Sequence, residues 1–356
     1  MQNNYILKRK MSFTKYIKKY ALNKFFQSED QENFVVHLCP AVTSDNVGDF
    51  IIADAVSKEL AKLFPQAYIG TYPCKTPLHS PAVYRCNQAC FRFVGGTNIL
   101  QGKKPQRTWA VPFSDLWKYR KAILMGAGWG KYQKKISLSS RMFYRALLDN
   151  RFLHSVRDSY TCDQLKKCGI ENVICTGCPT TWNLTESFCS QIPAGKKSSA
   201  VVTLTDYAKD PERDQALLNA CAANYENLFF FPQSSADIPY FHAVLPAELA
   251  GKFNVIAPDL AEYDRFLTEI QPDFIGTRLH GGIRALQHRC RVLIIGIDNR
   301  AKEMGKDISL PFLPQENMKE LPGLLQNGWD IALKIPQKNI DIWKDQFRKN
   351  PAPESI

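Results

Sequence analysis

The stretch FIGTRLHGGIRALQHRCRVLIIG, residues 274–296, decides the expected fold. It opens with the apolar run Phe274–Gly276, continues with helical spacing over Gly282–Gln287 and closes with the apolar run Val292–Ile295. A strand, a helix and a second strand in such close succession predict a β-α-β unit with parallel strands. Arg278 and His280 stand where the first strand ends, so a cation and a titratable ring directly follow a buried segment.

The same alternation of strand and helix extends to both sides of this unit. We expect further strands at Phe34–Leu38, Phe91–Val94, Ala122–Met125, Leu153–Val156, Asn172–Cys175, Ala200–Leu204, Leu228–Phe231 and Phe253–Ile256. Helical spacing predicts helices at Asp49–Phe64, Ser137–Leu148, Asp158–Cys168, Arg213–Asn224, Asp237–Ala250 and Tyr263–Ile270. This order is typical of the α/β class with mostly parallel sheets.

The alternation stops between Leu184 and Ser199, where serine, proline, glycine and lysine gather as they do in linkers. We therefore expect two Rossmann-like, doubly wound domains that face each other across a cleft. The expected division is a basic segment 1–30, an N-terminal domain 31–188, a linker 189–198, a C-terminal domain 199–335, and a C-terminal helix and tail 336–356.

The net charge of +12 is concentrated in part near the N-terminus. Seven Lys and Arg residues precede the first acid, Glu29, and apolar residues recur among them at helical spacing. This basic amphipathic segment either rests on an anionic membrane or docks on its own domain. No RNA-binding motif accompanies the charge, which disfavours nucleic acid as a partner. Without a signal peptide or a long apolar span, we expect a cytoplasmic chain, with peripheral membrane contact as an open alternative.

The eleven cysteines are scattered, which indicates reduced and mostly buried thiols. Cys175 and Cys178 form the one tight pair, and a four-sulfur zinc site would need a second such pair. We also find no His, Asp and Glu cluster with ligand spacing, so no metal is expected.

Ligands of open α/β sheets bind beyond the carboxyl ends of the strands, where helix N-termini and tight turns can approach an anion. Four turns of this sequence meet that description: Ser44–Asp49, Gly95–Asn98, Ser155–Asp158 and Thr277–Gly282. The turn Gly126–Gly130 is a fifth and weaker candidate.

In their order, these turns resemble the motifs of the polysaccharide pyruvyl transferase family. The resemblance runs from about Phe34 to Pro311 and rests on this set: Asn46, Gly48 and Asp49; Gly95 and Gly96; Ser155 to Asp158; Thr277 to Gly281; and Asp298, Arg300 and Glu303. It implies a fold like that of the B-type glycosyltransferases. It also implies phosphoenolpyruvate as the donor substrate, no cofactor, and a glycan or lipid-linked oligosaccharide as the acceptor, on which a pyruvate ketal forms.

Two positions depart from the family pattern. Thr97 stands where many members have a third glycine, and Cys178 stands where many have aspartate. Both departures bear on the choice of acceptor more than on the donor chemistry.

The resemblance also implies roles for individual residues. His280 would protonate the donor carbon, Arg278 would hold the donor anion together with Arg157 and Arg300, and Asp49 would act as general base. The remaining expected substrate contacts are Asn46, Gly95, Gly96, Thr97, Asp158, Leu279 and Gly281. The structural alternatives are a buried Arg–His pair and, for Asp49 and Asp158, the capping of helix N-termini.

Two other function classes stay open at this point. A B-type nucleotide-sugar glycosyltransferase would use the same architecture, with a basic turn around the diphosphate. A non-catalytic, membrane-peripheral glycan-binding protein would bury Arg278 and His280 away from any cleft. The acceptor sugar, its hydroxyls and its carrier are not indicated by the sequence.

Overall fold

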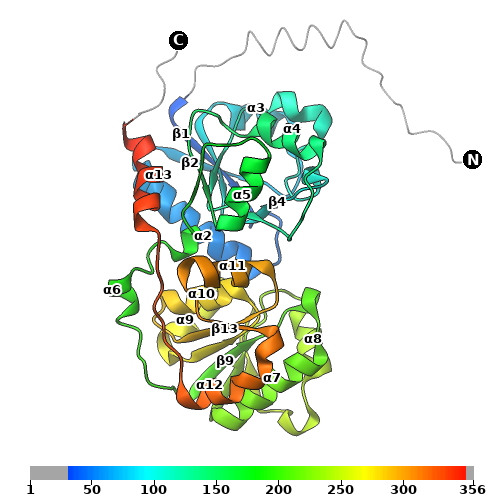
Figure 1. Cartoon of the computed structure of the whole chain (residues 1–356), viewed down its shortest axis with the longest axis vertical. Coiled ribbons are helices and arrows are strands. Elements are labelled where there is room, and N and C mark those ends of the chain that lie inside the picture. The colour runs from blue at the N-terminus through cyan, green and yellow to red at the C-terminus, as the bar shows by residue number, and fades with distance from the viewer. Residues whose placement is uncertain (1–30, 350–356) are drawn as a thin grey trace, which may run out of the picture.

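The computed structural model of the chain describes residues 31–349. The expected basic helix of residues 1–30 therefore lies outside the described residues. Two parallel β-sheets, each flanked by helices, stack along the long axis of the molecule (Figure 1). The expected α/β fold with two parallel sheets is thus confirmed. No helix in the described part is both long enough and apolar enough to cross a membrane.

The N-terminal sheet has the strand order β2-β1-β3-β5. Its strands are β1 (Gln31–Cys39), β2 (Tyr68–Pro73), β3 (Ala89–Gly95) and β5 (Ile123–Met125). Two further parallel pairs, β4 with β6 and β7 with β8, comprise Asn98–Leu100, Gly128–Trp129, His154–Val156 and Val173–Cys175. The helices of this half are α2 (Val47–Leu63), α3 (Ser80–Asn87), α4 (Leu138–Leu147) and α5 (Ser159–Lys167).

The C-terminal sheet has the strand order β11-β10-β9-β12-β13-β14. Its strands are β9 (Ser199–Thr203), β10 (Asn227–Phe230), β11 (Phe253–Val255), β12 (Asp273–Gly276), β13 (Val292–Gly296) and β14 (Phe312–Pro314). Its helices are α7 (Pro211–Asn224), α8 (Asp237–Val244), α9 (Leu260–Ile270), α10 (Leu279–Gln287), α11 (Asn299–Ile308) and α12 (Leu321–Asn327). The short α6 (Glu186–Cys189) lies between the two halves in the sequence.

Helix α10 begins earlier than the sequence predicts, at Leu279 with Arg278 as its N-cap residue. The glycine at 282 therefore lies inside the helix. A Cβ atom there would lie 2.3 Å from Ile294 Cδ1 and 2.9 Å from Phe274 Cε1, so this glycine lets α10 pack closely on β12 and β13. The earlier start places His280 in the first turn of the helix, with its side chain fixed by a regular backbone.

Two other expectations about elements are wrong in detail. The single helix predicted over Asp237–Ala250 ends at Val244, because Pro246 disfavours helical backbone at Leu245 before it. The edge strands β2 and β14 were not predicted. β2 is mostly exposed or half-buried and shows no continuous apolar run, and β14 is only three residues long and ends in a proline.

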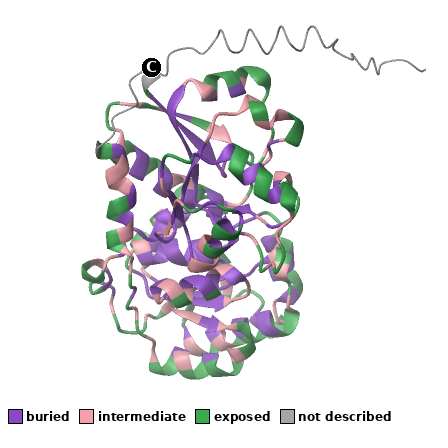
Figure 2. Ribbon diagram, turned by 45° about the horizontal axis from the view of Figure 1, so that its top comes forward, coloured by how far each residue is buried: buried purple, intermediate pink, exposed green. Residues whose placement is uncertain are grey.

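The two halves pack directly against each other through α2 and α10. Val47 and Ile51 of α2 share one hydrophobic cluster with Leu279 and Ile283 of α10. The backbone N–H of Val47 also donates to the carbonyl of Gln233 at 2.8 Å. Buried residues accordingly continue from one core to the other through the junction (Figure 2).

The chain returns to the N-terminal half in helix α13 (Gln337–Lys349), drawn in red in Figure 1. Trp343 and Phe347 of this helix pack against Phe93 of β3. The indole N–H of Trp343 donates to the carbonyl of Leu153 at 2.8 Å. The last helix thus completes the core of the first sheet.

Candidate active site

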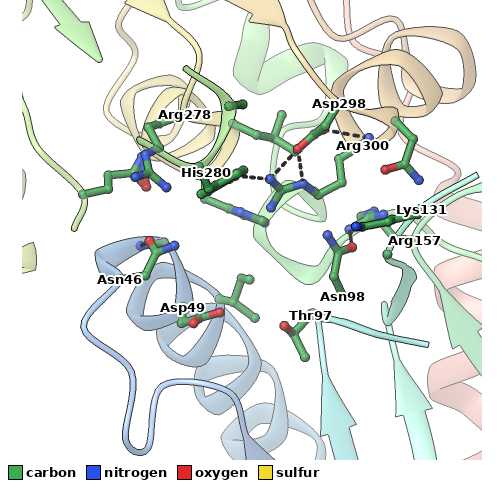
Figure 3. Close-up of a pocket in the computed structure, with 18 of the residues that line it drawn as sticks. Asn46, Asp49, Thr97, Asn98, Lys131, Arg157, Arg278, His280, Asp298 and Arg300 are labelled. Atoms are coloured by element: carbon green, nitrogen blue, oxygen red, sulfur yellow. Dashed lines mark hydrogen bonds and ion pairs between the residues drawn. The ribbon is translucent and has the colours of Figure 1, made fainter. Parts of the chain in front are cut away.

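A cleft of about 610 Å³ lies at the junction of the two halves, and both contribute to its lining. The N-termini of α2, α10 and α11 reach it, which directs the positive ends of three helix dipoles toward one space. The polar side chains that line it are Asn46, Asp49, Lys75, Thr97, Asn98, Lys131, Tyr132, Arg157, Tyr207, Gln233, Arg278, His280, Asp298, Asn299 and Arg300. Figure 3 shows most of them around the open centre.

His280 stands near the middle of this group (Figure 3). Its ring is buried, and Nε2 lies 3.8 Å from the Sγ of Cys178 in the N-terminal half. Burial lowers the pKa of His280 to about 3, and the positive charges of Arg300 and Arg157 add to this effect. The ring is therefore neutral in the empty cleft at physiological pH.

Arg300 and Asp298 form one unit at the start of α11. Asp298 accepts a hydrogen bond from the backbone N–H of Arg300 at 2.9 Å and one from its Nε at 2.8 Å. Burial alone would raise the pKa of Asp298, but the Arg300 guanidinium outweighs that effect and holds this pKa below its usual value. Arg300 also donates to the Tyr207 hydroxyl at 2.6 Å, and its side chain keeps an exposed fraction of 19%.

Arg157 lines the cleft and is almost completely buried. Its Nε donates to Asp158 at 3.0 Å and its Nη1 donates to Asn98 at 2.7 Å. Gly128 makes room for the guanidinium, because a Cβ atom there would lie 2.3 Å from its central carbon. Arg157 is thus a fixed positive charge at the cleft.

Arg278 lines the cleft, but its guanidinium is already engaged. It bonds to Asp237 and donates to Asp206 at 2.9 Å, and its Nε donates to the carbonyl of Leu204 at 3.1 Å. Asp237 also accepts the backbone N–H of Gln233 at 2.9 Å. The carbonyl of Gln233 in turn accepts the N–H of Val47 at the start of α2. The Arg278–Asp237 pair therefore fixes a part of the C-terminal half that contacts the N-terminal half.

Asp49 and Asn46 lie at the start of α2. Asn46 is the N-cap residue, and its side chain accepts the N–H of Gly48 at 2.8 Å. Asp49 accepts hydrogen bonds from Ser44 and Lys75, each at 2.6 Å and both on Oδ2. Asp49 thus has a cationic partner that the sequence analysis did not anticipate.

Four of the expected substrate contacts do not line the cleft. Gly95 and Gly96 pack against α2, since Cβ atoms there would each lie 2.6 Å from a methyl carbon, of Val56 and Ile52 respectively. Gly96 also has a φ of +45°, which favours glycine. Gly281 packs against Gln233, and Asp158 caps α5 while it pairs with Arg157. Thr97 and Leu279 do line the cleft.

Sequence reasoning missed several residues that the fold brings to the cleft: Lys75, Lys131, Tyr132, Tyr207 and Gln233. Lys131 directly follows the weaker candidate turn Gly126–Gly130, which was the available signal. Of the Lys and Arg side chains that line the cleft, Lys131 alone has no carboxylate partner within residues 31–349.

The described residues hold no group of three His, Cys, Asp or Glu side chains that could bind a metal ion. Cys175 and Cys178 are free thiols, and Cys178 is buried beside His280. The cleft therefore offers cations and helix N-termini, which suit an anionic ligand.

Comparison with known families and structures finds one family and several similar folds. The family model described as polysaccharide pyruvyl transferase matches residues 46–299. A UDP-GlcNAc 2-epimerase from Methanocaldococcus jannaschii, solved with UDP-GlcNAc and UDP, is similar in fold: TM-score 0.52, 11% identity, 89% of this chain and 98% of that chain covered. A putative UDP-N-acetylglucosamine 2-epimerase from Listeria monocytogenes gives a TM-score of 0.49 at 11% identity, over 92% of this chain and 100% of that one. The comparison with curated proteins finds no significant match.

Proposed function

Because the chain belongs to the polysaccharide pyruvyl transferase family, we propose that it moves the pyruvyl group of phosphoenolpyruvate onto two hydroxyls of a glycan. The product would be a pyruvate ketal, with release of phosphate. The observation that carries this proposal is a neutral, buried histidine close to the charges of Arg300 and Arg157, in a cleft that Lys131 also lines and that three helix N-termini reach.

The donor is strongly anionic, since it carries a phosphate and a carboxylate on three carbons. Arg300 and Lys131 are accessible enough to bond these groups directly, and Arg157 contributes a buried positive charge behind them. The backbone N–H groups at the starts of α10 and α11 add further donors for anionic oxygens. In this proposal Arg278 holds Asp237 and, through it, Gln233 in place, and it does not bind the donor.

Donor binding would also raise the pKa of His280, the proposed general acid. The charges of Arg300 and Arg157 help to lower the pKa of His280, after burial itself. An anionic donor beside these arginines offsets their charge, so the pKa of His280 rises when the donor binds. The ring then holds a proton that it can transfer to the methylene carbon of the donor.

The remaining steps follow from that proton transfer. Protonation turns the methylene group into a methyl group and leaves the adjacent carbon electrophilic. One acceptor hydroxyl attacks this carbon and loses its proton. The carbon–oxygen bond to phosphate then breaks, and a second hydroxyl closes the ketal and releases the second proton. One proton restores His280, and the other leaves with phosphate or solvent.

Asp49 is our candidate for the base that accepts the first hydroxyl proton. It lines the cleft, and both of its hydrogen bonds fall on Oδ2. Lys75 pairs with that same oxygen, so Oδ1 is left to accept a hydroxyl proton. The acceptor would enter past Tyr132 and Tyr207, whose exposed rings stand at the cleft and can cover the apolar face of a sugar.

Ligand-induced stabilisation tests the donor assignment. Phosphoenolpyruvate at a hundred times its Kd should stabilise the fold by about 2.7 kcal/mol, measured as a shift of thermal unfolding. UDP-sugars and GDP-sugars at the same concentration should have no such effect. Stabilisation by a nucleotide sugar without any by phosphoenolpyruvate would replace this proposal with the glycosyltransferase alternative.

A further inference from the structure

Helix α4 exposes apolar side chains on the face that points away from its own core. Leu138 and Met142, one turn apart, have exposed fractions of 72% and 61%. Phe113, from the short 3₁₀ helix Phe113–Lys118, is also exposed, and its ring centroid lies 5.4 Å from that of Phe143 on α4. We call Phe113, Leu138 and Met142 the α4 patch. Leu138 and Met142 are neighbours on one exposed helix face, and adjacent exposed apolar side chains of this kind mark an interaction site.

The surroundings of the α4 patch are strongly basic. Residues 60–148 contain fifteen Lys and Arg residues and a single acid, Asp115. Asp115 is paired with Lys118 at 2.5 Å. Residues 131–145, which include most of α4, have no acid, and their basic residues are all exposed: Lys131, Lys134, Lys135, Arg141 and Arg145. Exposed basic side chains therefore flank the patch along the chain.

We propose that the α4 patch and the basic residues of 131–145 dock this chain on an anionic lipid bilayer. Leu138 and Met142 would enter the boundary between headgroups and acyl chains, while Lys134, Lys135 and Arg141 bind the anionic headgroups. A soluble polyanion would satisfy the charges but would leave the apolar side chains in water. A second copy of this chain would bring like charges together.

Leu138 and Met142 of the α4 patch follow two residues of the cleft closely in the sequence. Lys131 and Tyr132, which line the cleft, begin the same segment that leads into α4. The docked segment would therefore be continuous in sequence with one wall of the cleft. This inference rests on the exposed side chains and the charge, and it holds whatever the cleft binds.

Vesicle binding by the full chain tests the proposal. The wild type should pellet with vesicles of phosphatidylcholine that contain about one third phosphatidylglycerol, and it should do so far less with phosphatidylcholine alone. Leu138→Gln together with Met142→Gln should weaken partitioning at least about tenfold, which corresponds to roughly two methylene groups withdrawn from the bilayer. Ile342→Gln is the matched control, because Ile342 is an exposed apolar residue on α13, at the other side of the molecule in Figure 1.

Hydrogen exchange separates this surface from the basic segment 1–30. With the same vesicles, the backbone amides of residues 131–145 should be protected in the wild type and lose that protection in the double variant. Protection confined to other parts of the chain would overturn the proposal. So would equal vesicle partitioning of the wild type and the double variant. Equal protection of residues 131–145 by soluble heparin would assign the surface to polyanions instead.

Discussion

The Nε2 atom of His280 lies 3.8 Å from the Sγ of Cys178, across the junction of the two halves. Burial raises the pKa of this thiol, so it stays protonated and brings no negative charge to the ring. Cys178 stands where many members of the family have aspartate. In this chain the neutral state of His280 is therefore not opposed by a carboxylate at that position.

A first prediction follows for Cys178→Asp. A carboxylate this close should raise the pKa of His280 by about 1–3 units, because an opposite charge favours the protonated ring. If His280 is the acid, the alkaline limb of the profile of kcat against pH, which reports the donor complex, shifts to higher pH. Cys178→Ser, which adds no charge, is the control and should leave the profile in place. An unchanged pH profile in Cys178→Asp would show that His280 is not the general acid.

The second prediction concerns His280 itself. His280→Gln keeps a polar side chain of similar size but cannot donate a proton at neutral pH. Turnover should fall by about 10²–10⁴-fold, while the affinity for phosphoenolpyruvate changes little. Phosphate release and ketal formation report the turnover, and calorimetry reports the affinity. Turnover near that of the wild type would remove His280 from the mechanism.

The third prediction separates Arg278 from Lys131. Arg278→Ala should destabilise the fold by about 3–5 kcal/mol, because it leaves the buried carboxylate of Asp237 without its cation. Lys131→Ala should leave stability nearly unchanged and weaken phosphoenolpyruvate binding by about 1.5–3 kcal/mol. Denaturant unfolding and calorimetry measure the two quantities. An Arg278→Ala variant that is as stable as the wild type but has lost affinity for phosphoenolpyruvate would show that Arg278 binds the donor.

The sequence predicted the fold well because its strands are apolar and its turns carry glycine and caps. The parallel sheets and the positions of His280 and Arg300 at one cleft follow from the rule that parallel strands end at the same edge. The partners of Arg278 could not be predicted in this way. Asp206 and Asp237 are far from it in sequence, and only the tertiary packing decides which side chains meet.

Two of the cations that line the cleft could not be predicted from the sequence either. Lys75 follows β2, an edge strand that shows no clear pattern, and Lys131 follows a turn that lacks a capping residue. The glycines illustrate the opposite error. Gly95 and Gly96 suggested direct contacts with a ligand, but only Thr97 and Asn98 of that turn line the cleft, and the two glycines serve the close packing of β3 on α2.

A last prediction uses two buried histidines outside the cleft. Burial lowers the pKa values of His37 and His154 to about 4 each. Neither ring nitrogen of His37 has a hydrogen-bond partner among residues 31–349. His154 is satisfied: its Nδ1 accepts the N–H of Leu124 at 3.2 Å, and its Nε2 bonds the carbonyl of Asp149 at 2.8 Å.

The sign of the pH effect follows from these lowered pKa values. Between about pH 6.5 and pH 4, the unfolded chain binds a proton at each histidine before the folded chain does, so stability falls as the pH falls. His37→Leu should therefore reduce the slope of the unfolding free energy by up to about 1.4 kcal/mol per pH unit in this window. At pH 7.5 it should leave stability unchanged or higher, since no hydrogen bond is lost, whereas His154→Leu should cost about 1–3 kcal/mol. Urea unfolding at pH 7.5 and pH 5 measures both variants, and a slope equal to that of the wild type in His37→Leu would contradict a neutral, buried His37.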